Sequence, residues 1–223
     1  MTKRVSDEIE SFKYAGQPVK FTIGTLALIA FCIFLIIIST FTQLPVVDVF
    51  SLSRGEEGSG FLLSDYLANS SYYKYIPQLP AIFFAIALLD RRYGLAAIIL
   101  YILLGLFVFP VFGMGGGVNY IMENGFGYIL AYIPGTFITA TIIKHDYRFL
   151  TILKGVFLGV LAIHLIGVMY MVFISTLFQA SADMIAGWIV SQSGIKILYD
   201  MFFCIVAIYF ASLVKRGLWL IMC

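Results

Sequence analysis

Residues 88–135 read LLDRRYGLAAIILYILLGLFVFPVFGMGGGVNYIMENGFGYILAYIPG and contain two long apolar runs on either side of a polar loop with three consecutive glycines. The runs cover residues 95–111 and 126–143, and each has nearly the length of about 20 residues with which a helix crosses the hydrocarbon core of a bilayer. The pattern therefore predicts two membrane helices joined by an irregular loop, residues 112–125.

The rest of the chain has the same membrane-protein character. Of its 223 residues, 61% are hydrophobic and only 12% are charged, whereas an average soluble domain has roughly 45–50% apolar and about 25% charged residues. A formal net charge of +2 is too small to favour a nucleic-acid partner. We therefore predict a multi-pass protein of the cell (inner) membrane, surrounded by the lipid bilayer, with residues 1–223 as a single transmembrane domain.

The apolar residues gather in six segments, at 21–41, 76–89, 95–111, 126–143, 150–174 and 195–214. We expect each segment to form a helix, which makes the fold an all-α integral membrane protein with six transmembrane helices. The second segment is short and carries Pro77 and Pro80 at its start. It is either tilted or completed by residues 72–75.

The Lys and Arg residues set the expected orientation, because cytoplasmic loops are enriched in both. With an even number of crossings, all but Arg54, Lys74 and Lys196 fall on the side of the two termini. Both termini are therefore predicted to be cytoplasmic. This places a cytoplasmic segment at 1–20 and outer loops at 42–74, 112–125 and 175–194.

The glycine loop has two interpretations. A nucleotide-binding P-loop is disfavoured because the loop lacks the Gly-Lys-Ser/Thr ending. The loop is either a flexible hairpin between two spans or a backbone that approaches a ligand closely through Gly115, Gly116 and Gly117. In the second case Asn119 and the helix start near Phe126 offer directed hydrogen bonds. Irregular backbone at membrane depth is tolerated where it lines a cavity.

Two outer loops contain further apolar stretches. The first loop ends in residues 61–75, which are rich in aromatic and aliphatic side chains, and residues 182–189 of the last loop have apolar positions at helical spacing. Both stretches are interpreted as lids or interfacial helices.

An ionisable residue within a predicted span marks a candidate site, because a charge at the centre of a membrane helix costs about 2.5–3.5 kcal/mol on insertion scales. Asp200 lies four residues after Lys196, so the two share a helix face. They form either an internal ion pair or part of a ligand site.

Other polar and aromatic residues within the spans have the same two interpretations. His164 and Gln78 either make hydrogen bonds between helices or contact a ligand. Tyr128 and Tyr170 either belong to the general aromatic content of the spans or stack on a small heterocycle.

Several motifs in order resemble one known family. They are the basic turn at 91–94, the Tyr- and Leu-rich segment at 101–105, the Gly-rich loop at 110–117, the FGY helix start at 126–128, IHLIGVMY at 163–170, and the terminal helix. Across roughly residues 76–216 the chain resembles the biotin-specific substrate-binding (S) component of energy-coupling-factor (ECF) transporters, the BioY family.

The resemblance implies a function and partners. A BioY protein is a six-helix binding component, without enzymatic activity or a cofactor of its own, that captures biotin from outside. It works with a membrane coupling subunit and a pair of ATPases, which use the ATP. In this chain the resemblance implies that Phe126, Gly127 and Tyr128 start a binding helix, that Asp200 accepts from the ureido N–H groups, and that a lysine faces the ligand carboxylate.

The lysine that the resemblance implies does not stand at its usual position in this sequence. The family commonly has a lysine three residues after the aspartate, where this chain has Phe203, so Lys196 is the expected substitute. Two other functions remain open: an S component for a different vitamin, or a structural membrane protein. An intramembrane protease is disfavoured, because no Gly-x-Ser motif in a neighbouring span accompanies His164.

Overall fold

The computed structural model describes residues 22–47, 72–144 and 146–222. In these ranges the elements are the helices α2 (Ile23–Phe41), α5 (Gln78–Phe107), α6 (Phe126–Ile143), α7 (Phe149–Leu177), α8 (Ala182–Ser193) and α9 (Lys196–Met222), the 3-10 helix η1 (Val118–Met122), and the strands β1 (Leu44–Val47) and β2 (Tyr72–Tyr75).

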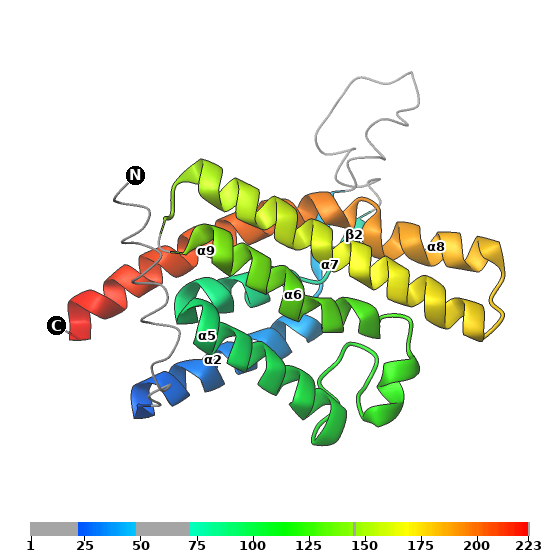
Figure 1. Ribbon diagram of the computed structural model, residues 1–223, viewed down its shortest axis with the longest axis horizontal. Helices are drawn as coiled ribbons and strands as arrows, with labels where there is room; N and C mark the ends of the chain where they lie inside the picture. The colour runs from blue at the N-terminus through cyan, green and yellow to red at the C-terminus, as the bar shows by residue number, and fades with distance from the viewer. Residues whose placement is uncertain (1–21, 48–71, 145, 223) are drawn as a thin grey trace, which may run out of the picture.

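The long helices form one bundle. Helix α6 packs most extensively on α7, while α5 packs on α9, α2 and α6. Figure 1 shows α8 at the same end of the molecule as the green chain between α5 and α6, and away from the end of α9 that is marked C. The irregular segments that the sequence places outside the membrane therefore gather at one end of the bundle.

Four helical stretches in the described residues are long and apolar enough to cross a membrane, namely Ile23–Phe41, Phe126–Ile143, Phe149–Leu177 and Ala182–Leu218, the last of which joins α8 to α9. The predicted helices at 126–143, 150–174 and 195–214 are confirmed as α6, α7 and α9. The helical membrane class is confirmed, with the addition of two short strands that the sequence analysis did not anticipate.

The second and third predicted segments fall largely in α5, which begins at Gln78 and ends at Phe107, before the predicted end at residue 111. A non-helical residue, Asp90, with φ 62° and ψ 171°, interrupts this helix between them. The proposed helical completion at 72–75 is wrong, because Tyr72–Tyr75 is strand β2 and pairs antiparallel with β1. Helix α5 instead begins at Gln78, directly after Pro77. Proline is tolerated at a helix start because the first N–H groups there have no partner within the helix.

The last outer loop, 175–194, contains the helix expected from its apolar spacing. This helix is α8, and the hydroxyl of Ser181 caps its start by accepting from the N–H of Met184 at 3.4 Å. None of the twelve residues of α8 is buried. Segment 1–20 and most of the first outer loop lie outside the described residues, so the expected surface helix at 61–75 is described only at its end, where the chain is β2.

Small residues bring α6 and α7 into close contact, as is common between membrane helices. A Cβ atom on Gly159 would lie 2.0 Å from Oγ1 of Thr139, and one on Gly135 would lie 2.3 Å from the side chain of Ile163. The hydroxyl of Thr139 donates across the interface to the carbonyl of Gly155 at 2.9 Å. Helix α7 is therefore held at a fixed distance from α6, and both helices contribute to the site described next.

Candidate ligand-binding site

A cavity of about 210 Å³ lies between the helices, close to the end of the bundle where the irregular segments gather. It is lined by Thr40, Ile76, Gln78, Leu79, Gly113, Met114, Tyr120, Gly125, Tyr128, Ile129, Tyr132, Ile163, His164, Gln192 and Lys196. A water molecule takes up about 30 Å³ of liquid. The cavity is therefore large enough for a small organic molecule, and its lining combines aromatic rings with a few polar groups, as ligand sites do.

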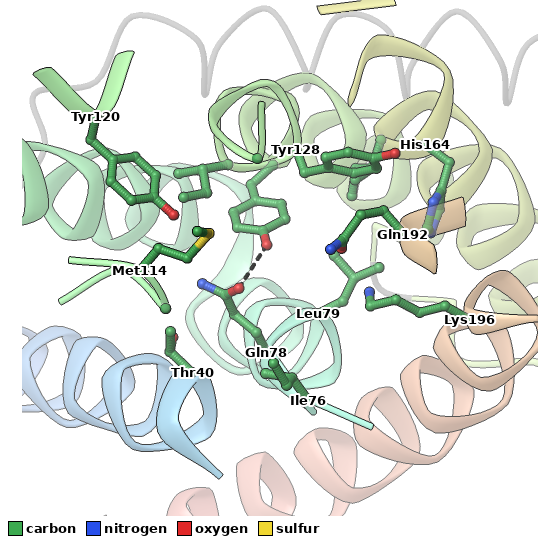
Figure 2. A pocket seen from close by; sticks show the side chains of 15 residues that line it. Thr40, Ile76, Gln78, Leu79, Met114, Tyr120, Tyr128, His164, Gln192 and Lys196 are labelled. Carbon is green, nitrogen blue, oxygen red and sulfur yellow. Dashed lines mark hydrogen bonds between the residues drawn. The ribbon is translucent and has the colours of Figure 1, made fainter. Parts of the chain in front are cut away.

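Four of the residues predicted from sequence line this cavity: Gln78, Tyr128, His164 and Lys196. They come from α5, α6, α7 and α9 in turn. Figure 2 shows Gln78 in the middle of the site, with His164 and Lys196 toward one side and Met114 toward the other. The bundle thus brings together side chains that are as far apart in sequence as residues 78 and 196.

Asp200 lies behind this group and is fully buried, with 0% of its surface exposed. Its Oδ1 atom accepts from the hydroxyl of Tyr75 at 2.7 Å. Its Oδ2 atom accepts from Lys196 Nζ at 2.7 Å and lies 3.1 Å from His164 Nε2. The predicted proximity of Asp200 and Lys196 is confirmed. Both carboxylate oxygens are already engaged by protein donors, and Asp200 is not among the residues that line the cavity.

Lys196 connects this buried carboxylate to the cavity. Its side chain is 20% exposed and lines the cavity, while its ammonium group forms the ion pair with Asp200. An ammonium group has three N–H donors. After the bond to Asp200, the others remain for water or a ligand acceptor.

A second group of hydrogen bonds ends at the same histidine. The Oγ atom of Ser193 lies 2.9 Å from His164 Nδ1 and 2.6 Å from the hydroxyl of Tyr128. Because the carboxylate of Asp200 can only accept, Nε2 of His164 carries the ring proton, and Nδ1 accepts from Ser193. Ser193 in turn accepts from Tyr128. No motif or spacing in the sequence predicts a role for Ser193.

The order Ser193, His164, Asp200 is that of the hydrolase triad, but the surroundings do not match those of an acyl-transfer enzyme. Such enzymes direct backbone N–H groups at the developing oxyanion beside the serine. Here the N–H of Gly194, which follows Ser193, donates to the carbonyl of Val190 at 2.9 Å. The hydrogen-bond chain therefore fixes His164 and the end of α8 beside the cavity.

The middle one of the three consecutive glycines, Gly116, packs against the end of α5. A Cβ atom on Gly116 would lie 2.7 Å from both the carbonyl oxygen of Gly105 and Cα of Pro110. The N–H of Gly117 donates to the same carbonyl of Gly105 at 2.8 Å. Gly115 and Gly117 have φ values of 124° and 90°, which favour glycine. None of the three lines the cavity, so packing explains Gly116, and the positive φ values explain Gly115 and Gly117.

Neighbouring residues of the loop reach the cavity instead. Gly113 and Met114, which come just before the triple glycine, line it, and so does Tyr120 in η1. Asn119 is exposed and is not part of the lining, while Phe126 is 5% exposed and its ring packs on that of Tyr120 with centroids 6.3 Å apart.

Gly127 and Tyr170 connect the loop between α5 and α6, which contains η1, to the helix bundle. A Cβ atom on Gly127 would lie 2.3 Å from Cβ of Tyr170, so α6 and α7 are in direct contact at this level. The hydroxyl of Tyr170 donates to the carbonyl of Ile121 in η1. Neither residue lines the cavity. Both position η1, which contributes Tyr120 to the lining.

Several lining residues were not predicted, and only one had a sequence signal. Tyr132 follows Tyr128 by four residues on α6, so the two share a face. Its hydroxyl donates to Oε1 of Gln78 at 2.9 Å. Thr40 and Gln192 lie at the ends of α2 and α8, and no spacing rule links them to the other lining residues.

A comparison with protein-family models decides the family of this chain. The BioY family model matches residues 74–219, which include all but one of the cavity-lining residues, Thr40. The chain belongs to the BioY family. Known BioY-like proteins can therefore be compared with it directly.

A curated relative, "Probable biotin transporter BioY" from Lysinibacillus sphaericus, is 38% identical over 55 residues, which is 25% of this chain and 28% of that relative. A solved structure, described as the S-component for biotin from an ECF-type ABC transporter, superposes with a TM-score of 0.61 at 20% sequence identity. The superposition covers 88% of this chain and 95% of that one. This second likeness establishes that the present chain has the BioY fold.

Proposed function

We propose that this protein is the substrate-binding membrane component of a biotin uptake system, working with an ECF coupling subunit and a pair of ATPases. The observation that carries the proposal is the cavity of about 210 Å³ in a BioY-family chain, with a lysine cation and an uncharged amide in its lining. Both similar proteins are described as biotin proteins, one as a probable biotin transporter and the other as an S-component for biotin. ATP would be used by the partner ATPases.

The chemistry of the cavity suits biotin. Biotin has an apolar bicyclic body, a polar cyclic ureido group and a carboxylate at the end of an aliphatic chain. Tyr128, Ile129 and Ile163 supply aromatic and aliphatic surface for the body. Lys196 supplies a cation for the carboxylate. Phe203, at the position where the family commonly has a lysine, stacks on Tyr75 with ring centroids 5.0 Å apart, so Lys196 takes over the cationic role.

This proposal is tested by equilibrium binding of labelled biotin to the purified protein, with unlabelled thiamine, riboflavin and biotin methyl ester as competitors. Biotin is expected to bind about 100-fold more tightly than the other two vitamins, a difference of about 2.7 kcal/mol. The ester lacks the carboxylate for Lys196, so it is expected to compete about 10-fold more weakly than biotin.

The outcomes separate the two remaining functions. Binding of thiamine or riboflavin in preference to biotin would make the chain an S component for another vitamin. If no vitamin binds or shifts the thermal unfolding midpoint, the chain has a structural role and the proposal fails.

We further propose six crossings with both termini cytoplasmic. The break at Asp90 divides α5 into two crossings, and the carboxylate of Asp90 pairs with Lys215 of α9 at 2.5 Å. The hydroxyl of Tyr147, in the turn between α6 and α7, donates to the carbonyl of Ala87 at 3.2 Å. The basic break in α5, the basic turn between α6 and α7, and the part of α9 that carries Lys215 thus lie at one end of the bundle. This agrees with the positive-inside rule.

Thiol labelling in intact cells tests this topology. In a background without the native cysteines, Met122→Cys is expected to react with a membrane-impermeant maleimide, while Arg148→Cys is expected to react only after the membrane is permeabilised. Both side chains are well exposed, at 58% and 83%, so access alone does not explain a difference. Labelling of Arg148→Cys from outside would contradict the proposed orientation.

A further inference from the structure

The amide of Gln78 is held between two tyrosines. Its Nε2 atom donates to the hydroxyl of Tyr101 at 2.8 Å, and its Oε1 atom accepts from the hydroxyl of Tyr132 at 2.9 Å. Tyr101 is fully buried and Tyr132 is 6% exposed. The two bonds restrain the amide from both sides, and Figure 2 shows its oxygen and nitrogen at the cavity.

The surrounding hydrogen bonds decide which way the amide faces. The carbonyl of Val111 accepts from the hydroxyl of Tyr101 at 3.5 Å, so Tyr101 can use its oxygen to accept from Gln78. With the amide flipped, Tyr101 would donate to Oε1 and leave the carbonyl of Val111 without this donor. Tyr132 would then have to accept from Nε2, and its buried proton would lose the acceptor Oε1. The observed orientation therefore satisfies one more donor, which favours it in a buried site.

The restrained amide keeps hydrogen-bonding capacity for a ligand. A glutamine amide has two N–H donors and two carbonyl lone pairs, and the two tyrosines use one of each. One N–H and one lone pair remain at Gln78, which lines the cavity. Asp200 is engaged by Tyr75, His164 and Lys196 and lies outside the lining. Gln78 thus offers the cavity both a donor and an acceptor from an amide that two tyrosines restrain.

We propose that Tyr101 and Tyr132 orient Gln78 to recognise the ureido group of the ligand by accepting from a ureido N–H and donating to the ureido carbonyl. This inference rests on the proposed biotin function and deepens it. In this arrangement Tyr132 is a positioning residue, because it acts through Gln78. Among the other polar side chains that line the cavity, Lys196 and Gln192 remain for the rest of the ligand, because both ring nitrogens of His164 are engaged by Asp200 and Ser193.

The test compares biotin with 2-iminobiotin, in which a guanidine replaces the urea. When protonated, this group offers only donors. For the unmodified protein we expect biotin to bind at least about 10-fold more tightly than protonated 2-iminobiotin, because the N–H of Gln78 loses its acceptor. Gln78→Glu offers only acceptors, and Tyr132 can still donate to it. This variant is expected to bind biotin about 10-fold more weakly and to prefer 2-iminobiotin.

Tyr132→Phe keeps the ring and removes the hydroxyl that orients the amide. It is expected to reduce the preference for biotin over 2-iminobiotin several-fold, because the freed amide can present either edge. The matched control is Tyr147→Phe, which also removes one hydroxyl, from a hydrogen bond to Ala87 away from the cavity. This control is expected to leave both affinities and their ratio unchanged.

The possible results are distinguishable. If the unmodified protein binds no biotin, the proposed function fails and the inference with it. If the unmodified protein binds biotin but Gln78→Glu and Tyr132→Phe, both folded by thermal unfolding and gel filtration, keep its ratio of affinities, the inference alone is overturned. A change in ratio that the Tyr147→Phe control also shows would equally overturn it, because the effect would then come from general loosening of the bundle.

Discussion

Asp200→Asn is expected to destabilise the bundle by about 3–5 kcal/mol, the usual cost of breaking a buried ion pair by removing one partner. In the unmodified protein the two carboxylate oxygens of Asp200 accept hydrogen bonds from Tyr75, His164 and Lys196. An asparagine side chain has one oxygen, so turned one way its NH₂ group meets the ammonium of Lys196, and turned the other way the hydroxyl proton of Tyr75 and the ammonium of Lys196 no longer both have a carboxylate acceptor. The loss is measured as the change in unfolding free energy during SDS titration of the purified protein in mixed micelles.

The matched control is Asp183→Asn. Asp183 is exposed in the first turn of α8, where an acidic side chain is worth at most about 1 kcal/mol. The double variant with Lys196→Met is expected to be less destabilised than the sum of the two single variants, because Lys196 then leaves no unpaired charge. Additive effects of the two changes, or equal costs at Asp200 and Asp183, would contradict the buried ion pair as a source of stability.

Gly159→Val is expected to prevent the close packing of α6 on α7. Even Gly159→Ala places a Cβ atom 2.0 Å from Oγ1 of Thr139 and 2.9 Å from the carbonyl oxygen of Gly135. Overpacking of this kind costs typically about 1–3 kcal/mol for small additions, so the larger side chain is expected to cost more. The yield of monodisperse protein by gel filtration and the unfolding free energy by SDS titration measure the effect.

Two further variants isolate the cause. Gly24→Val changes a glycine of α2 that has no neighbouring atom within 4 Å of an added Cβ, and it is expected to leave folding unchanged. Thr139→Ala removes the hydroxyl oxygen that Gly159→Ala would meet, so the double variant is expected to recover part of the loss. If Gly24→Val were as damaging as Gly159→Val, the cause would be helix propensity or insertion, and the contact between α6 and α7 would not explain it.

Much of the helical framework follows from the sequence. The apolar segment at 126–143 coincides with α6, the one at 150–174 falls within α7, and the one at 195–214 falls within α9 except for its first residue. Long apolar runs can be located this way because a membrane helix satisfies its own backbone hydrogen bonds and needs only apolar side chains of sufficient length. The break at Asp90 and the pairing of β1 with β2 depend on contacts between distant segments, and no local pattern reports them.

The site was predictable only in part. Gln78, His164 and Lys196 were expected because polar groups in a bilayer span are unusual enough to need an explanation, and Tyr128 because it belongs to the FGY helix start that resembles the BioY family. All four line the cavity. The triple glycine was expected to approach a ligand, whereas Gly116 packs on α5. A glycine permits close approach of any neighbour, and the sequence does not say whether that neighbour is a ligand or another helix.

By itself, the sequence determined that the chain lies in a membrane, where its longest helices run, and that Lys196 and Asp200 share one face of a helix. These properties depend on composition and on the 3.6-residue helical period, which act over short stretches of chain. Only the tertiary structure decided that Ser193 and Tyr75 reach the same buried group and that Tyr132 holds Gln78. Those contacts depend on how closely and at what level the helices pack, which small residues such as Gly159 set through contacts between helices.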